Sequence, residues 1–304
     1  MGHTVRRLRA ESTVALTSAG VPNPDGDVAW LLAQAAGVDR RDLVTVEELT
    51  DQQAEVFEAA VVRRAAREPL QHILGVAGFR YLTLLVGPGV FVPRPETEVL
   101  AELALAEIAS QRAAGIRTKL TVVDLCTGSS AIALALAIEA GQLEMYAVEA
   151  DEGAAAWAAR NISDHAEEIA AVQSTLELWM GQAAFALGHS PLAKLRGKID
   201  VVTCNPPYIP DDAIPRDREV SEFDPSVALY GGPDGLDVVR QVVHVASQML
   251  RPDGALLIEH GDAQGEDAGP LGIPELIRAH PSFAQVQDHQ DLTHRPRVTT
   301  ARRR

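Results

Sequence analysis

Three polar segments carry residues that could bind and activate a small molecule, and each follows an apolar run typical of a buried strand. The stretch Asn-Pro-Pro-Tyr at 205–208 follows one such run, the loop at 126–130 follows a second, and Glu149 ends a third. Ligands of open parallel sheets bind outside the carboxyl ends of the strands, where the strand order reverses. The spacing therefore predicts that the three segments line one crevice.

The residues at 205–208 have the properties needed to hold a planar NH2 group. An amide nitrogen is a poor nucleophile because its lone pair is delocalised. The side-chain oxygen of Asn205 and the carbonyl of Pro206 could orient such a nitrogen towards an electrophile, while Pro207 has no N–H that would compete. The ring of Tyr208 can stack on the planar group. This pattern indicates positioning rather than strong-base catalysis; the simpler alternative is a proline-rich structural turn.

The loop Cys126–Ser130 leads from a predicted strand into a predicted helix. A tight turn of small residues at a helix start presents backbone N–H groups to a ligand, although an ordinary strand–helix connection has the same appearance. Glu149 lies about 20 residues after Gly128, the spacing at which an acid can accept hydrogen bonds from ribose hydroxyls. The alternative for Glu149 is an exposed acid at the end of a strand.

The elements that must position these residues change in character along the 304-residue chain. Residues 1–75 show apolar spacing typical of helices and predict a small helical domain. Residues 76–98 mix β-branched and aromatic residues with Gly and Pro, which indicates a hairpin-like linker. Residues 99–304 alternate strands with helices, so we expect an α/β domain with a doubly wound parallel sheet covered on both faces.

Composition narrows the class of partner. The chain has 42 acidic and 27 basic residues, a formal charge of −15, which disfavours a nucleic acid as partner.

The sequence also gives expectations about metal and membrane. Its two cysteines form neither a disulfide framework nor a zinc cluster, so no metal is expected. There is no apolar signal core and no apolar stretch of about 18 residues, so we expect no membrane span and a cytoplasmic location.

Several segments together resemble one family. Val-Pro-Arg-Pro-Glu-Thr-Glu at 92–98, the loop at 124–130, Asn-Pro-Pro-Tyr and Gly-Gly-Pro-Asp-Gly-Leu-Asp at 231–237 match the release factor glutamine methyltransferases (the HemK/PrmC family). The resemblance extends over nearly the whole chain. Asn-Pro-Pro-Tyr alone is shared with adenine methyltransferases of DNA and RNA, whereas the first and last of these segments are much more specific.

The resemblance implies a class I methyltransferase domain (Rossmann-like) and an N-terminal helical bundle that recognises the protein substrate. It implies methyl transfer from S-adenosylmethionine to the side-chain amide of the Gln in a release factor's Gly-Gly-Gln motif. Matching positions imply a cofactor site and a substrate site. The cofactor-binding residues would be Cys126, Thr127, Gly128, Ser129, Ser130, Glu149, Gln182, Ala183 and Asn205; the substrate-binding residues would be Glu96, Asn205, Pro206, Pro207 and Tyr208.

Three residues depart from the family pattern. Cys126 and Ser130 stand where the family has Gly, and a side chain at 130 would crowd the cofactor if the backbone there has positive φ. Gln182 stands where the family has an Asp that contacts the adenine amine; its amide oxygen still accepts, without charge. Two alternatives remain open: a methyltransferase acting on another planar nitrogen (adenine or another protein glutamine), or a non-catalytic paralogue with weakened cofactor binding.

Overall fold

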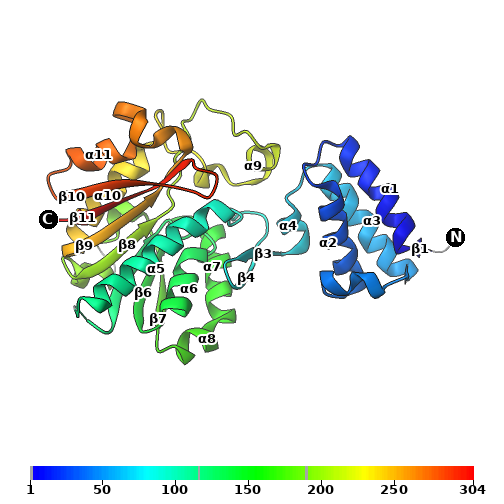
Figure 1. Ribbon diagram of the computed structural model, residues 1–304, viewed down its shortest axis with the longest axis horizontal. Helices are drawn as coiled ribbons and strands as arrows, with labels where there is room; N and C mark the ends of the chain where they lie inside the picture. The colour runs from blue at the N-terminus through cyan, green and yellow to red at the C-terminus, as the bar shows by residue number, and fades with distance from the viewer. Residues whose placement is uncertain (1–2, 116, 189–190) are drawn as a thin grey trace. The chain divides into compact units, whose positions relative to one another are not determined.

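The computed structural model describes residues 3–115, 117–188 and 191–304 and divides the chain into two compact units (Figure 1). The first unit comprises Met1–Val76, Val86–Pro88 and Pro215–Phe223, and the second comprises Ala77–Leu85, Gly89–Ile214 and Asp224–Arg304. The segment Pro215–Phe223 thus belongs to the first unit although it follows the Asn-Pro-Pro-Tyr stretch in the chain. No sequence pattern predicted this assignment.

The first unit is helical, as the apolar spacing predicted. Its elements are β1 (His3–Thr4), α1 (Val5–Ser18), α2 (Pro24–Ala36), η1 (Arg40–Thr45), β2 (Glu48–Leu49), α3 (Asp51–Ala65), α4 (Leu70–Leu74) and α9 (Arg218–Phe223). Gly37 ends α2 with a φ of 72°, and Thr50 and Gln53 form a capping box at the start of α3. The helices pack around Leu16, Leu32 and Phe57, all of which are fully buried.

A buried ion-pair network holds α9 within this unit. Arg64 of α3 is 5% exposed, and its guanidinium donates to Asp27 Oδ2 and to Glu219 Oε1, each at 2.8 Å. Arg67 donates to both oxygens of Glu219. Burial opposes the charge on Glu219, but Arg67 and Arg64 outweigh it and lower the pKa of that carboxyl to about 2.

The second unit is built on a seven-stranded sheet in the order β10-β11-β9-β8-β5-β6-β7. The strands are β5 (Leu120–Leu125), β6 (Leu143–Glu149), β7 (Thr175–Met180), β8 (Ile199–Cys204), β9 (Leu250–Glu259), β10 (Phe283–Gln290) and β11 (Pro296–Arg303). Strands β5 to β9 are parallel to one another. Strand β11 runs antiparallel to both of its neighbours, β9 and β10. The chain passes from β5 through β6 to β7 and returns to β8 on the other side of β5. The strand order therefore reverses between β5 and β8.

Helices cover both faces of this sheet, which confirms the doubly wound prediction (Figure 1). Helices α5 (Glu98–Ala113) and α6 (Ala131–Ala140) pack on one face, together with α7 (Glu152–Asp164) and α8 (Ala166–Ala171). Helices α10 (Asp237–Met249) and α11 (Ile273–Ala279) pack on the other. Because both faces are buried, β5 and β8 have no exposed residue.

The predicted hairpin-like linker contains β3 (Val76–Phe79) and β4 (Leu82–Leu85), which form a two-stranded sheet. A 3-10 turn, η2 (Pro95–Thr97), then leads directly into α5. Asn161 of α7 fixes the end of β4, because its side chain accepts from the Leu85 N–H at 2.7 Å and donates to the Leu85 carbonyl at 3.0 Å. Among the described residues, no helix combines the length and apolar character needed to span a membrane.

Candidate active site

The three segments predicted to line one crevice lie at the carboxyl ends of β5, β6 and β8, and the end of β9 lies next to them. Strands β5 and β8 are direct neighbours, with Leu125 opposite Cys204, so the loop after β5 and Asn205 begin side by side. Strand β9 lies next to β8, with Ile258 opposite Cys204, and this places Glu259 beside Asn205. The topology thus brings together the three segments singled out in the sequence and adds a fourth.

Asp124, near the end of β5, anchors both sides of the crevice. Its Oδ2 accepts from the Thr127 hydroxyl at 2.6 Å, and its Oδ1 accepts from the Thr203 hydroxyl of β8 at 2.7 Å. Burial raises the pKa of Asp124 to about 7, against the opposing effect of the two hydroxyls. The carboxyl group therefore fixes the loop and β8 to the same point.

The loop 126–130 has left-handed backbone at three residues. The φ angles of Cys126, Gly128 and Ser130 are 58°, 57° and 65°. Cys126 and Ser130, which stand where the family has Gly, therefore strain the backbone, since positive φ costs a non-glycine residue roughly 1–2 kcal/mol. Ser130 is fully buried, and its hydroxyl has no hydrogen-bond partner among the described residues. The positive φ on which crowding of the cofactor depended is therefore present, but the Ser130 side chain is enclosed by protein.

Gly128 differs from its neighbours because it borders open space. A Cβ atom at this position would meet no heavy atom within 4 Å. Asn161, which also holds β4, donates to the Ser129 carbonyl at 3.0 Å, and the Thr127 N–H donates to the Val148 carbonyl at 3.0 Å. Thr127 and Ser129 are buried, so the loop is fixed on both sides of Gly128. A ligand can therefore approach the backbone at Gly128 closely.

Glu149, at the end of β6, already accepts several backbone hydrogen bonds. Its Oε2 accepts from the Gly128 N–H at 2.7 Å, and its Oε1 accepts from Ala150 and Asp151 at 2.9 and 3.0 Å. A carboxylate has about four acceptor positions, so about one stays available, on Oε2. Glu149 can accept from both ribose hydroxyls only if the two hydroxyls share this one acceptor position, or if the hydrogen bond from the Gly128 N–H breaks.

The stretch 205–208 is held in place by the Gly-Gly-Pro-Asp-Gly segment. The Ile209 N–H donates to the Leu229 carbonyl, and the Gly231 N–H donates back to the Ile209 carbonyl, each at 2.9 Å. A Cβ atom on Gly231 would lie 2.5 Å from the Pro207 carbonyl oxygen. Only glycine allows this approach, which gives a physical reason for the second specific segment of the resemblance.

Asn205 contacts a cluster that the sequence reasoning did not single out. Its Nδ2 donates to the Thr97 hydroxyl at 3.3 Å, and that hydroxyl donates to Glu259 Oε1 at 3.2 Å. Thr97 is 4% exposed and Glu259 is 2% exposed. Glu96, the predicted substrate residue, is exposed next to Thr97, and its role stays a prediction.

Charged groups surround this cluster. Burial raises the pKa of both Glu259 and the Tyr208 hydroxyl, and Arg297 of β11 opposes each rise. Arg94 forms an ion pair with the buried Asp224 at 2.7 Å. The signal that could have identified Glu259 was its place at the end of an apolar strand, the same place that Glu149 occupies on β6.

Gln182 and Ala183 lie just beyond β7. The Gly181 N–H donates to the Glu149 carbonyl at 2.7 Å, so the chain leaves β7 at the crevice edge. Gln182 is exposed at the start of η3 (Ala183–Phe185), whereas Ala183 is buried and packs with the sheet core. Their predicted contact with an adenine ring stays a prediction.

Comparisons with known proteins agree with the motifs. A family model described as the PrmC N-terminal domain matches residues 7–75. The release factor glutamine methyltransferase of Streptomyces coelicolor is 42% identical over 298 residues, which cover 97% of this chain and 96% of that protein. That of Bifidobacterium longum is 40% identical over 297 residues, with 96% and 97% covered.

A solved structure provides a comparison of folds. The T. thermophilus 16S rRNA N2 G1207 methyltransferase (RsmC), in complex with AdoMet and guanosine, aligns with a TM-score of 0.49 at 21% identity. The alignment covers 75% of this chain and 50% of that one.

Proposed function

The chain belongs to the release factor glutamine methyltransferase family, and on this premise we propose that it transfers a methyl group from S-adenosylmethionine to a release factor. The acceptor is the side-chain amide of the Gln in the Gly-Gly-Gln motif. The observation that carries the proposal is the position of Asn205, directly beside the loop 126–130 at the strand-order reversal. The second unit is then a class I methyltransferase domain.

The residues present fit S-adenosylmethionine. Open space next to Gly128 lets the donor approach the backbone at the start of α6, and Glu149 retains an acceptor position for a ribose hydroxyl. Gln182 is exposed at the crevice edge, where its amide could meet the adenine amine. When bound there, the donor supplies a methyl group activated by a sulfonium. The positive φ angles of Cys126 and Ser130 strain the loop itself. The Ser130 side chain is fully buried and the Cys126 side chain packs against the core, so neither occupies this space.

The residues at 205–208 then hold and orient the acceptor. The Asn205 side-chain oxygen and the Pro206 carbonyl accept from the two N–H groups of the glutamine amide, which directs the nitrogen lone pair towards the donor side of the crevice. Pro207 has no competing N–H, and the Tyr208 ring, partly exposed, can cover the amide plane. These residues lower the barrier by positioning and by fixed dipoles.

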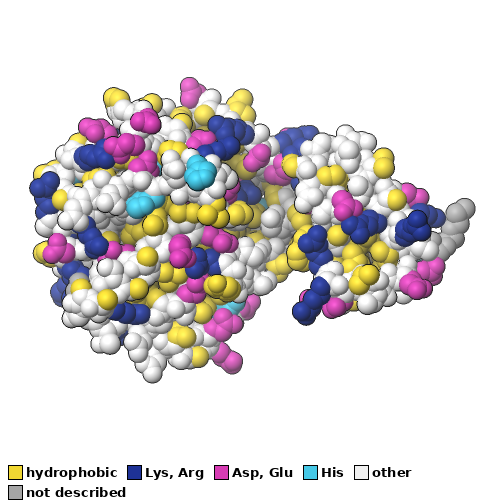
Figure 2. Space-filling model, viewed as in Figure 1, with side chains coloured by type: hydrophobic (Ala, Val, Ile, Leu, Met, Phe, Trp, Pro, Cys, Tyr) yellow, Lys and Arg dark blue, Asp and Glu magenta, His cyan; other side chains and the backbone are white. Residues whose placement is uncertain are grey.

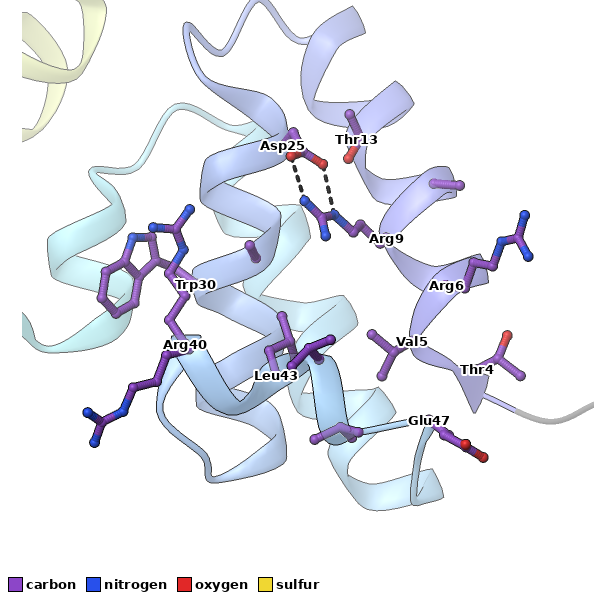
Figure 3. Close-up of a pocket in the computed structure, with 15 residues that line it drawn as sticks. Thr4, Val5, Arg6, Arg9, Thr13, Asp25, Trp30, Arg40, Leu43 and Glu47 are labelled. Carbon is purple, nitrogen blue, oxygen red and sulfur yellow. Dashed lines mark hydrogen bonds and ion pairs between the residues drawn. The ribbon is translucent and has the colours of Figure 1, made fainter.

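We assign recognition of the release factor to the helical unit. A groove of about 1210 Å³ lies between α1, α2 and the segment 40–47 (Figure 3). Its lining includes the apolar Val5, Ala29 and Leu43 and also Trp30, which is 44% exposed. Hydrophobic and basic side chains lie close together on the face of this unit shown in Figure 2. An exposed tryptophan beside an apolar groove is typical of a protein-binding surface.

The charges of this groove favour an acidic partner segment. Four arginines line it: Arg6, Arg9, Arg40 and Arg41. Arg9 is paired with Asp25, whereas Arg40 lies 5.3 Å from the centre of the Trp30 ring and forms no ion pair with any described residue. We therefore expect the groove to take an acidic segment of the release factor that carries an apolar side chain and lies outside the Gly-Gly-Gln tip.

One experiment tests the activity. The protein is incubated with labelled S-adenosylmethionine and a bacterial release factor, and the peptide that contains Gly-Gly-Gln is analysed by mass spectrometry. A single added methyl group on that Gln supports the proposal. Label on another residue, or label only when DNA or RNA replaces the factor, would assign the enzyme to another planar nitrogen. No transfer to any of these substrates, together with no cofactor binding in calorimetry, would indicate a non-catalytic protein.

The partner and location follow from the same proposal. The net charge of −15 favours a protein substrate over a nucleic acid. A cytoplasmic location, where translation takes place, stays the prediction made from the sequence.

A further inference from the structure

Glu259 has no role in the mechanism described above, yet it is buried beside Asn205. Its side chain is almost fully enclosed, and one oxygen, Oε1, accepts from the Thr97 hydroxyl. The other oxygen, Oε2, forms no hydrogen bond of standard geometry in the part of the chain that the structure describes. Burial raises the pKa of Glu259, and the Asn205 side chain lies close enough to oppose that rise directly. A carboxylate that served only to stabilise the fold would normally have both oxygens paired, since burying an incompletely paired charge is unfavourable.

The two hydrogen bonds that link Asn205 to Glu259 through the Thr97 hydroxyl have a fixed direction. An ionised carboxylate only accepts, so the Thr97 hydroxyl must donate its single proton to Glu259. The lone pairs of that hydroxyl then face Asn205, whose side chain must present its NH2 group. The oxygen of the Asn205 amide is thereby turned away from Thr97. This orientation is the one required to accept from the NH2 of a substrate glutamine.

From this chain of hydrogen bonds we propose that Glu259 is a positioning residue for methyl transfer, acting through Thr97 to hold the Asn205 amide in its productive orientation. The inference rests on the proposed role of Asn205. It assigns a function to the two segments that flank the crevice, the Thr97 turn before α5 and the end of β9. It also states which way round the Asn205 amide must lie.

The opposite orientation would be inactive for a simple reason. If the Asn205 amide turned by about 180°, its NH2 group would face the NH2 of the glutamine, and two donors cannot bond to each other. Asn and Gln amides have nearly the same shape in both orientations, so packing alone discriminates poorly between them. Discrimination requires a neighbour whose hydrogen-bonding role is fixed, and an ionised carboxylate is such a neighbour.

Substitutions at Thr97 separate this role from packing. Thr97→Val keeps the shape of the side chain but removes the hydroxyl, and Thr97→Ser keeps the hydroxyl but removes the methyl group. We expect Thr97→Val and Glu259→Gln to lower kcat by about 10- to 100-fold, the effect of losing one orienting hydrogen bond. Thr97→Ser should retain kcat within about threefold of the wild-type value, on the same reasoning. The Kd for S-adenosylmethionine, measured by calorimetry, should stay unchanged in all three.

The control is Glu102→Gln, which replaces the carboxylate of an exposed residue of α5 by an amide, the same substitution as Glu259→Gln. Thermal unfolding of each variant identifies any that fails to fold, and the near-isosteric Thr97→Val keeps the test valid if Glu259→Gln does not fold. The inference is overturned if Thr97→Val has wild-type kcat, or if Thr97→Ser is impaired as much as Thr97→Val. Asn205→Ala, measured in parallel, distinguishes the failures. If Asn205→Ala is inactive while Thr97→Val is fully active, only the positioning role is wrong; if Asn205→Ala is also active, the role of Asn205 is wrong.

Discussion

A Cβ atom on Gly235 would lie 2.3 Å from the carbonyl oxygen of Tyr208. That carbonyl also accepts from Gln264 Nε2 at 3.0 Å, so the last residue of the Asn-Pro-Pro-Tyr stretch is held between a backbone and a side chain. The position of the catalytic residues therefore depends on a glycine about thirty residues further along the chain. Its φ of 75° adds a second reason for glycine there.

Gly235→Ala should displace Tyr208 and lower kcat by about 100-fold, the effect of a misplacement of about 1 Å at a catalytic group. The matched control is Gly197→Ala. Gly197 has a φ of 68°, and an added Cβ there would meet nothing within 4 Å. Both variants should lose roughly 1–2 kcal/mol of stability from backbone strain alone, but only Gly235→Ala should lose activity. Equal activities of the two variants would show that the contact with Tyr208 is unimportant.

Asn205→Ala should abolish most methyl transfer, with a loss of about 100-fold or more in kcat, because the amide of the substrate loses a preorganised acceptor. Cofactor binding should be largely retained, since the loop 126–130 and Glu149 are unchanged. Steady-state kinetics and calorimetry with S-adenosylmethionine check the two halves of this prediction. Activity within a few-fold of wild type would contradict the role of Asn205.

Ser130→Gly should leave cofactor affinity unchanged or improve it. The substitution removes a side chain at a φ of 65° and a buried hydroxyl without a described partner, so the free energy of unfolding should rise by about 1 kcal/mol. Gly128→Ala is the opposite change, because it places a methyl group in the open space that the cofactor would use. We expect it to weaken cofactor binding. A large loss of affinity in Ser130→Gly would reveal a contact of the serine with the ligand.

The activity should rise as the pH increases through about 7. Burial raises the pKa of Glu259 from 4.5 to about 7; Thr97, Arg297 and Asn205 oppose this shift, and Glu96 adds to it. Tyr208 also faces Glu259, but burial keeps its phenol neutral in this range. Since the ionised carboxylate orients Asn205, kcat should fall as Glu259 becomes protonated. A pH profile of kcat checks this, and the inflection near 7 should be weaker in Glu259→Gln, in which Asp124 still titrates in this range.

Stability should change with pH in the opposite direction. The unfolded chain releases the Glu259 proton near pH 4.5, whereas the folded chain keeps it until about 7. The folded state therefore loses stability as the pH rises through this window, by about 3 kcal/mol for this group. Asp124, whose pKa is raised from 3.8 to about 7, acts in the same direction. Chemical denaturation between pH 5 and pH 8 measures the slope, which should be shallower in Glu259→Gln.

Substitutions in the groove of the helical unit should affect only the intact protein substrate. Arg40→Glu and Trp30→Ala should each raise KM for a full-length release factor by about 5- to 10-fold, as loss of a contact of about 1 kcal/mol predicts. KM for an isolated Gly-Gly-Gln fragment should not change. Arg7→Glu is the control, because it makes the same charge change outside the residues that line the groove. Equal effects of Arg7→Glu and Arg40→Glu would exclude a specific role for the groove.

Sequence patterns were sufficient for the parts of the fold that depend on periodicity. The alternation of strands and helices predicted the doubly wound sheet. The spacing between Asn205 and the loop 126–130 was compatible with neighbouring strands, and the pairing of β5 with β8 shows that they are neighbours. Glu259 and Thr97 were missed because their importance comes from a hydrogen bond between residues 162 positions apart. Such a contact depends on the register of β9 against β8, which no local pattern reveals.

The segment Pro215–Phe223 has a practical consequence for anyone who divides the chain. A protein ending at residue 75 matches the extent of the helical family model, but it would lack Glu219. Arg64 would then keep Asp27 as an acidic partner and lose the other, leaving part of a buried guanidinium uncompensated. The helical portion is thus completed by nine residues encoded far downstream, and truncation at the apparent boundary would give an incomplete module.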